Sequence, residues 1–211
     1  STPIKSSAAS DVYKRQVILV DTLEGFMIEL RNVVVAYESR VILDSINLTI
    51  DDEETLVILG GSGSGKSTLL RLLIGLQRPT SGQIIVDGTD ITTLSEDEFN
   101  TVRRKMGMVF QYSALFDSMS VGENVAFGLR QHTDLGDDEI KRIVAERLDW
   151  VGLKGYESYM PNELSGGMKK RVSLARAIAL DPSLILYDEP SSGLDPITSC
   201  LLYTSDAADD L

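Results

Sequence analysis

The segment Gly60-Gly61-Ser62-Gly63-Ser64-Gly65-Lys66-Ser67 decides the fold, because it fits the pattern G-x-x-x-x-G-K-[ST]. An apolar run, Thr55–Leu59, precedes it, and leucines at helical spacing follow it as far as Leu76. This order predicts a buried strand, a glycine-rich phosphate loop and a helix. A flexible Gly-Ser linker would explain neither the Lys-Ser pair nor the flanking pattern.

The residue types of this loop suit a nucleotide. The glycines let backbone N–H groups turn inward around phosphate oxygens, and the positive end of the helix adds to the attraction. We expect Lys66 to reach the β- and γ-phosphates and Ser67 to ligate Mg²⁺. The expected nucleotide-binding residues of the loop are Gly60, Ser62, Gly63, Ser64, Gly65, Lys66, Ser67 and Thr68.

Strand and helix patterns alternate along the rest of the chain, which favours an α/β fold with a mainly parallel sheet and right-handed crossovers. Two β-branched stretches before the loop predict an antiparallel edge sheet. Ser95-x-x-Glu98 is typical of a capping box at a helix start. The predicted strands are 27–35, 41–50, 55–59, 83–86, 106–110 and 184–187, and the predicted helices start near 67, 96, 140 and 166.

Two carboxylates end the last predicted strand. Leu184-Ile185-Leu186-Tyr187 is followed directly by Asp188 and Glu189. At the carboxyl edge of the sheet, Asp188 can hold Mg²⁺ through water, and Glu189 can orient or deprotonate the water that attacks the γ-phosphate. Such a pair is weak evidence alone, but it is strong when it follows the phosphate loop in this order.

Leu164-Ser165-Gly166-Gly167-Met168 resembles the LSGGQ signature of ATP-binding cassette (ABC) proteins, and the resemblance runs from Met27 to Ser199. It implies a P-loop NTPase (RecA-like) core with a mainly parallel sheet, an antiparallel β edge subdomain, and an α-helical signature subdomain at about 112–165. It also implies ATP and Mg²⁺ as cofactors and a head-to-tail homodimer. In that dimer Ser165, Gly166, Gly167 and Met168 face a nucleotide on the opposite subunit, and Met168 departs from the usual Gln.

The same resemblance assigns further residues. Tyr37 matches the aromatic residue that stacks on adenine, and Gln111 matches the glutamine that contacts Mg²⁺ and the attacking water and links the core to the helical subdomain. The D-loop corresponds to Ser192, Gly193, Leu194 and Asp195. The expected catalytic residues are therefore Glu189 and Gln111, and the expected metal ligands are Ser67, Gln111 and Asp188.

The single histidine and the basic residues after the signature are interpreted as surface residues and not as site residues. The family's switch histidine lies beyond the D-loop, and the single histidine here, His132, precedes the signature and is interpreted as a surface residue. We therefore expect the cassette to be cut short after the D-loop, so that this fragment need not hydrolyse ATP. The basic residues after the signature are interpreted as a solvated helix face, namely Lys169, Lys170, Arg171 and Arg176.

A narrower resemblance concerns the type of transporter. The segments Phe110–Val121, Met168–Arg171 and Asp195–Thr198 resemble ATPases of the lipid-asymmetry (Mla) and mammalian-cell-entry (MCE) systems. This implies a permease docking near Gln111–Met119, where Leu115, Phe116 and Met119 are expected to be exposed, and an MCE lipid-binding protein. The implied location is the cytoplasmic face of the inner membrane, as a peripheral subunit. Two alternatives remain: an ABC importer for small polar solutes such as amino acids, and a soluble ABC protein of translation or DNA repair.

The composition agrees with a soluble subunit and not with a general nucleic-acid binder. The 211 residues carry 20 Lys+Arg against 32 Asp+Glu, a formal net charge of −12, and one cysteine. An acidic balance disfavours nucleic acid as a partner, and no apolar run approaches the roughly 18 residues of a membrane span. A single cysteine excludes a disulfide framework.

The two ends read as translated DNA adapter. One DNA string can encode Ser6–Gln16, and its reverse complement in a shifted frame encodes Cys200–Asp209. The string resembles a transposase adapter used in sequencing libraries, and such ends are set aside in fold reasoning. We therefore expect a tail at 1–16, a cassette at 17–199 that continues in the natural protein, and a second tail at 200–211. Met27 is a plausible start codon, with Val17–Phe26 as upstream translation.

Overall fold

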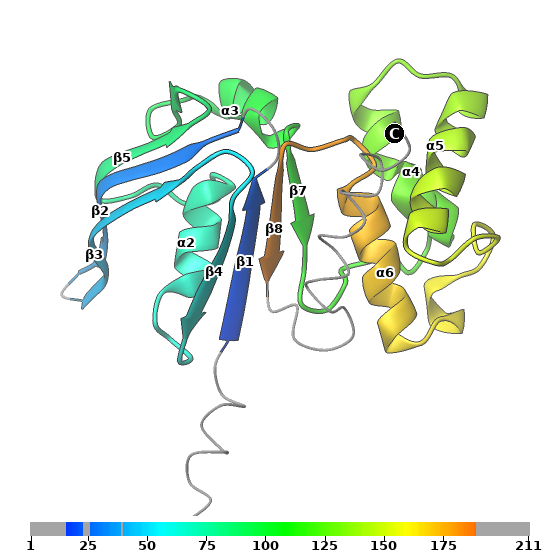
Figure 1. The fold of residues 1–211 in the computed structure, drawn as a ribbon, viewed down its shortest axis with the longest axis horizontal. Helices are drawn as coiled ribbons and strands as arrows, with labels where there is room; N and C mark the ends of the chain where they lie inside the picture. Colours follow the sequence, from blue (N-terminus) through cyan, green and yellow to red (C-terminus); the bar gives the residue numbers. More distant parts are fainter. Residues whose placement is uncertain (1–15, 23–25, 39, 189–211) are drawn as a thin grey trace, which may run out of the picture. The chain divides into compact units, whose positions relative to one another are not determined.

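A computed structural model describes residues 16–22, 26–38 and 40–188 of the chain. It divides into two compact units, which we call the N-terminal unit (Ser1–Phe99) and the C-terminal unit (Asn100–Leu211). Figure 1 labels most of the helices and strands of both units. Within the described residues, no helix is both long and apolar enough to cross a membrane.

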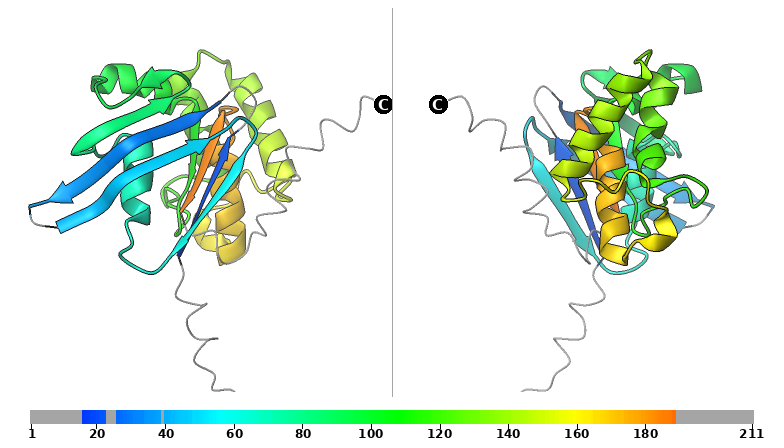
Figure 2. Two further views of the ribbon diagram at one scale, coloured as in Figure 1. Left: turned by 60° about the vertical axis from the view of Figure 1, so that its left-hand side comes forward. Right: turned by 90° about the vertical axis from the view of Figure 1, so that its right-hand side faces the viewer.

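The N-terminal unit contains the expected antiparallel sheet, with strand order β3-β2-β5-β6. Its long hairpin joins β2 (Ile28–Tyr37) to β3 (Arg40–Ile50), and β5 (Ser81–Val86) lies on the other side of β2 (Figure 2). A short strand, β6 (Thr89–Asp90), completes the sheet. One face of β2 is buried through alternate apolar side chains, as expected for a half-buried strand. The predicted edge sheet is therefore confirmed.

The strand, loop and helix predicted around the glycine-rich segment are also confirmed. Strand β4 (Thr55–Gly60) leads into the loop, and helix α2 (Lys66–Leu73) follows it. Helix α2 buries the side chains that its leucine spacing predicts, namely Leu69, Leu70, Leu72 and Leu73. The helix ends before Leu76 because Gly75 takes φ +69°, a left-handed conformation that closes helices. Leu76 is 70% exposed as a result.

A strand that the sequence analysis missed pairs with β4. Strand β1 (Gln16–Thr22) runs antiparallel to β4, with Val17 opposite Leu59. The sequence analysis interprets Val17–Phe26 as upstream translation, although this apolar sequence is compatible with a strand. Thr22 anchors its end, because Thr22 Oγ1 donates to Asp51 O at 2.6 Å and accepts from Glu54 N at 2.9 Å. Apart from Gln16, both predicted tails lie outside the described residues.

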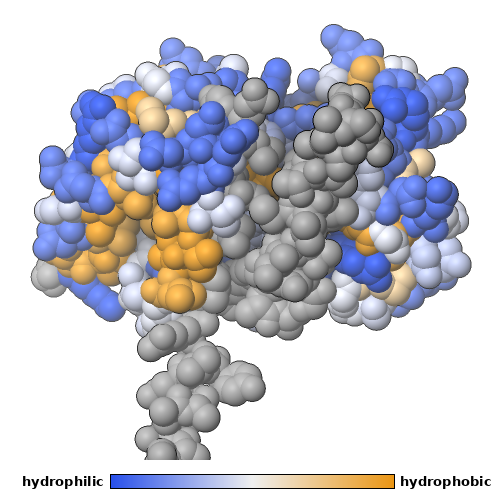
Figure 3. Space-filling view, in the orientation of Figure 1, coloured by the Kyte–Doolittle hydropathy of each residue, from blue (hydrophilic) through white to orange (hydrophobic). Residues whose placement is uncertain are grey.

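Strand β4 keeps apolar side chains at the surface of the N-terminal unit. Val57 is 48% exposed and Leu59 is 59% exposed, whereas Leu56 and Ile58 on the other face are half-buried. Figure 3 shows apolar surface on the part of the unit that contains β3, β4 and α2.

The C-terminal unit combines a parallel strand pair with a group of helices. Strands β7 (Met106–Val109) and β8 (Leu184–Asp188) are parallel, with Val109 opposite Tyr187. Helix α4 (Val121–His132) packs against α5 (Asp137–Trp150) and α6 (Gly166–Ala177), and α6 also packs on β7. Helices α4 and α5 lie within the range that the resemblance assigns to the helical subdomain. A short 3-10 turn, η1 (Pro161–Glu163), precedes α6.

Helix α3 (Glu96–Arg103) spans the boundary between the two units, and its predicted start is confirmed. Ser95 N donates to Glu98 Oε2 at 2.8 Å, and Glu98 N donates to Ser95 Oγ at 3.4 Å. These two contacts form the capping box that the sequence predicts.

Candidate functional site

The glycine-rich loop lies between the end of β4 and the start of α2, in the N-terminal unit. Gly63 and Gly65 have φ values of +79° and +91°, which residues with a side chain rarely adopt. A Cβ atom on Gly65 would lie 2.7 Å from Leu43 Cδ2 and 3.2 Å from Ile42 O, so this glycine is also required for space. The loop therefore turns tightly against β3 before the helix begins.

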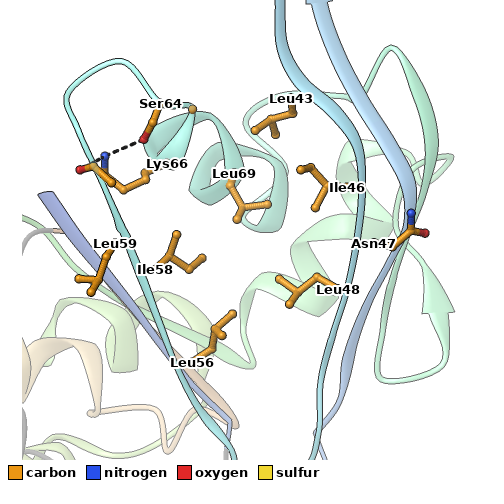
Figure 4. A pocket seen from close by; sticks show the side chains of 12 residues that line it. Leu43, Ile46, Asn47, Leu48, Leu56, Ile58, Leu59, Ser64, Lys66 and Leu69 are labelled. Atoms are coloured by element: carbon orange, nitrogen blue, oxygen red, sulfur yellow. Dashed lines mark hydrogen bonds between the residues drawn. The ribbon is translucent and has the colours of Figure 1, made fainter. Parts of the chain in front are cut away.

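Lys66 holds its ammonium group against this loop, as Figure 4 shows. Only 5% of the residue is exposed. Lys66 Nζ donates to Gly60 O at 2.9 Å, to Gly61 O at 2.7 Å and to Ser64 Oγ at 3.0 Å. Because an ammonium group has three N–H donors, each donor has an acceptor in the loop. The geometry fixes a positive charge beside the N-terminus of α2, an arrangement that attracts anions.

A pocket of about 240 Å³ opens at the loop. Gly63, Gly65 and the hydroxyl residues Ser67 and Thr68 line it beside Lys66, and all five belong to the predicted nucleotide-binding set, whose role stays a prediction. Arg40 and Ile42 of β3 also line it, and the sequence analysis missed both. Arg40 is opposite Tyr37 across the β2–β3 turn, so the predicted role of Tyr37 in binding adenine was a signal that Arg40 also lies near the site.

Tyr37 ends β2 and exposes 53% of its surface. It is an accessible aromatic residue, but it is not among the residues that line the 240 Å³ pocket. Its predicted contact with adenine stays a prediction.

A second, larger hollow of about 380 Å³ lies under the loop, between β3, β4 and α2 (Figure 4). Its walls are mainly apolar, and Ser64 and Lys66 lie at its polar end. The polar groups of the loop therefore border one end of an otherwise apolar hollow.

Gln111 and Asp188 follow or end two paired strands at one edge of the C-terminal unit. Asp188 is the last residue of β8, and Gln111 follows β7 by two residues. Because β7 and β8 are parallel and Val109 is opposite Tyr187, both residues leave the carboxyl end of the pair. Both are half-buried. Parallel sheets commonly bind ligands at this edge, and the predicted metal role of the two residues stays a prediction.

The signature segment begins helix α6 in the predicted way. Ser165 is the N-cap, and its Oγ accepts a hydrogen bond from Met168 N at 3.3 Å. Ser165, Gly166 and Gly167 are exposed, and a Cβ atom on either glycine would meet nothing within 4 Å. The N-terminus of α6 is therefore open to a ligand or a partner.

The remaining predicted residues fall into two groups, those outside the described residues and those whose position is known. Glu189 and the D-loop residues Ser192, Gly193, Leu194 and Asp195 lie outside the described residues. His132 is exposed at the end of α4, as expected of a surface residue. The phosphate loop belongs to the N-terminal unit, and the Asp188 edge belongs to the C-terminal unit.

Two details of the sequence analysis are wrong. Arg171 and Arg176 are half-buried and donate to main-chain carbonyl groups, so they do not form a fully solvated helix face. In the predicted docking segment, Phe116 is exposed, but Leu115 and Met119 are half-buried, because the segment folds back on α4. Tyr112, with 85% of its surface exposed, is the prominent side chain instead.

Comparisons with known proteins agree with this geometry. The chain is 49% identical over 172 residues to the "Intermembrane phospholipid transport system ATP-binding protein MlaF" of Haemophilus influenzae, covering 82% of this chain and 65% of that protein. It is 49% identical over 178 residues to the "Probable ribonucleotide transport ATP-binding protein mkl" of Mycobacterium tuberculosis, covering 84% of this chain and 50% of that protein. The chain thus spans about half to two thirds of the length of these relatives.

A solved structure supports the same assignment. The dimeric post-hydrolysis state of an ATP-binding cassette bound to ADP and Pi matches with a TM-score of 0.73 and 32% identity, covering 87% of this chain and 84% of that one. The sequence profile of the ABC transporter family matches residues 43–192. From the loop, the capped signature helix and these matches together, the chain belongs to the ABC transporter family.

Proposed function

We propose that the chain is the ATP-binding and ATP-hydrolysing subunit of an ABC transporter that moves phospholipid together with an MCE-type system. The observation that carries the nucleotide part is the buried Lys66 ammonium group, held across the loop by Gly60 O, Gly61 O and Ser64 Oγ. The name and 49% identity of the phospholipid-transport relative support the cargo.

The residues that line the pocket suit a nucleoside triphosphate. Lys66 and Arg40 supply positive charge, Ser67 and Thr68 supply hydroxyl groups, and Gly65 leaves no side chain in the way. In our proposal Lys66 exchanges hydrogen bonds to the loop for the β- and γ-phosphates, and the loop amides surround the phosphate oxygens. Tyr37 offers an exposed ring for adenine.

The proposed metal ligands have the donor types that suit magnesium. Ser67, Gln111 and Asp188 supply hydroxyl, amide and carboxylate oxygens, the ligand types that Mg²⁺ prefers. When bound, the ion neutralises charge on the phosphates. In our proposal Glu189, the neighbour of Asp188, orients the attacking water.

The signature helix is proposed to bind the nucleotide that the partner subunit holds. Ser165, Gly166, Gly167 and Met168 present a capped, exposed helix N-terminus that can bind the phosphate of a nucleotide on the partner. The dimeric cassette among the structural relatives supports a homodimer. The D-loop residues Ser192–Asp195 are proposed to join the same interface.

The membrane partner is a permease that docks on the segment Gln111–Met119, at the cytoplasmic face of the inner membrane. Tyr112 and Phe116 are exposed there and offer an apolar contact. An MCE lipid-binding protein is the proposed further partner. No nucleic acid is included, because the chain is acidic overall.

A transport assay tests the cargo. The complete protein that carries this cassette is assembled with its permease in liposomes, and ATP-dependent transfer of a fluorescent phospholipid is compared with uptake of a labelled ribonucleotide. Lipid transfer that Glu189→Gln abolishes, while ATP remains bound, is the expected result. Ribonucleotide or amino-acid uptake without lipid transfer would establish the polar-solute alternative and overturn the proposed cargo.

A further inference from the structure

The segment that follows Gln111 is held in place by a side chain from the signature helix. We call residues 112–120 the docking segment. Arg176 of α6 donates from Nη1 to Ala114 O at 2.7 Å and from Nη2 to Ser113 O at 2.9 Å. The planar guanidinium group thus spans two consecutive carbonyl groups, which the single ammonium of a lysine cannot do in the same way.

The two carbonyl groups belong to a backbone turn that needs support. Ser113 and Ala114 have φ values of +63° and +46°, in the left-handed region that residues with a side chain seldom adopt. Two such residues in succession persist only where surrounding contacts fix them. Ser113 is also buried, with 5% exposed. The Arg176 hydrogen bonds supply a contact of this kind.

The other end of the docking segment is fixed by α4. Asn124 is fully buried; its Oδ1 accepts from Phe116 N at 2.8 Å, and its Nδ2 donates to Phe116 O and Met119 O, both at 3.1 Å. The Phe116 ring packs on Phe127 at 4.9 Å between centroids, and the Arg176 guanidinium lies 5.9 Å from the Phe116 ring. The segment is therefore preorganised, with α6 holding its first half and α4 its second half.

Arg176 and the signature lie on one rigid helix. Ser165 caps α6, and Arg176 lies eleven residues later, about three helical turns along the same axis. Burial lowers the pKa of the Arg176 guanidinium from its usual value, so its neighbours have replaced part of its water. A displacement of the helix N-terminus is thus transmitted to the Ser113–Ala114 turn without a flexible joint.

We propose that Arg176 is a positioning residue that makes the docking segment move as one body with the signature helix. When the exposed N-terminus of α6 engages a nucleotide on the partner subunit, the Arg176 hydrogen bonds carry that movement to Tyr112 and Phe116 at the permease contact. This inference rests on the proposed function. It adds a second connection to the permease, separate from the chain continuity through Gln111.

The chain contains a matched control on the same helix. Arg171 of α6 also donates to two consecutive carbonyl groups, Val151 O at 3.0 Å and Gly152 O at 3.1 Å, in the turn after α5. It holds that turn and not the docking segment. Arg171 uses Nη1 alone for both contacts, whereas Arg176 uses Nη1 and Nη2. Arg171→Lys therefore controls for the loss of a guanidinium group from the same helix, with no expected effect on coupling.

The test uses the complete protein with its permease in liposomes. For Arg176→Lys we expect nucleotide affinity and permease-free ATPase activity within twofold of wild type, and at least a fivefold loss of the permease-dependent stimulation. Arg171→Lys should keep all three quantities within twofold. Normal stimulation in Arg176→Lys, or an equal fall of permease-free and stimulated turnover, would overturn the inference.

A second variant separates positioning from folding. Ala114→Gly makes the left-handed turn easier to adopt, so the double variant Arg176→Lys/Ala114→Gly should recover part of the lost stimulation. If Arg176→Lys alone fails to fold, the double variant decides, and full stimulation without the bidentate contact would overturn the inference. A wild-type protein that binds no ATP would instead reject the proposed function itself.

Discussion

Replacing Ser173 with alanine should stabilise the protein. Ser173 lies on α6 with none of its surface exposed, and its Oγ has no hydrogen-bond partner among the described residues. A buried polar group without a partner costs about 1–3 kcal/mol. Alanine also has a helix propensity better than serine by up to about 0.7 kcal/mol. The small void left by one oxygen atom offsets only a few tenths of a kcal/mol.

The net expected gain for Ser173→Ala is therefore about 1–2 kcal/mol. For a chain of this size that corresponds to a rise in Tm of roughly 2–8 °C. Urea unfolding of wild type and variant measures it directly, as a higher midpoint with an unchanged m value. Ser158→Ala, at an exposed position outside the helices, is the control and should change stability by less than about 0.5 kcal/mol.

The reasoning is refuted if Ser173→Ala lowers the free energy of unfolding. That result would mean that the hydroxyl has a bonding partner in solution, such as a main-chain carbonyl one turn earlier on α6.

Two other substitutions test the loop and a helix cap. Gly65→Ala should lower nucleotide affinity at least tenfold in a binding titration, because the added Cβ atom would clash with β3 and the φ of this residue is +91°. Gly61→Ala is the control: its added Cβ atom would meet nothing within 4 Å, so its affinity should stay within about threefold of wild type. Glu123 accepts hydrogen bonds from the backbone and side chain of Ser120, and these bonds lower the pKa of Glu123 from 4.5. The ionised carboxylate therefore contributes to stability above pH 4.5, and this contribution is lost as the pH falls through the lower pKa of the folded state. Thermal unfolding at pH 6 and pH 3.5 should therefore show a smaller loss of Tm for Glu123→Gln than for wild type, and an equal loss in both would contradict the role of this carboxylate.

Local patterns predicted the parts of the fold that local contacts determine. The loop, the β2–β3 hairpin, the capping box at Ser95 and the Ser165 cap all depend on residues a few positions apart. The sequence analysis misses strand β1 for a different reason: it interprets Val17–Phe26 as upstream translation, whereas the backbone of β1 pairs with β4.

Contacts between distant residues could not be predicted in the same way. Arg40 and Ile42 join the phosphate pocket because β3 folds over the loop. Arg176 lies 62 residues from Ala114 in the sequence, so a basic residue after the signature was interpreted as solvated. The partial burial of Met119 accompanies the hydrogen bond from Asn124 to Met119 O, which no spacing pattern reveals.

The measurement that tests the central claim most directly is nucleotide binding by the 211-residue chain. Titration with a fluorescent ATP analogue in the presence of Mg²⁺ compares wild type with Lys66→Ala, and with Lys141→Ala as a control that removes an exposed lysine of α5. We predict saturable binding for wild type and Lys141→Ala, and at least a hundredfold weaker binding for Lys66→Ala. Equal affinity in all three proteins, or no binding by a folded wild-type chain, would contradict the account.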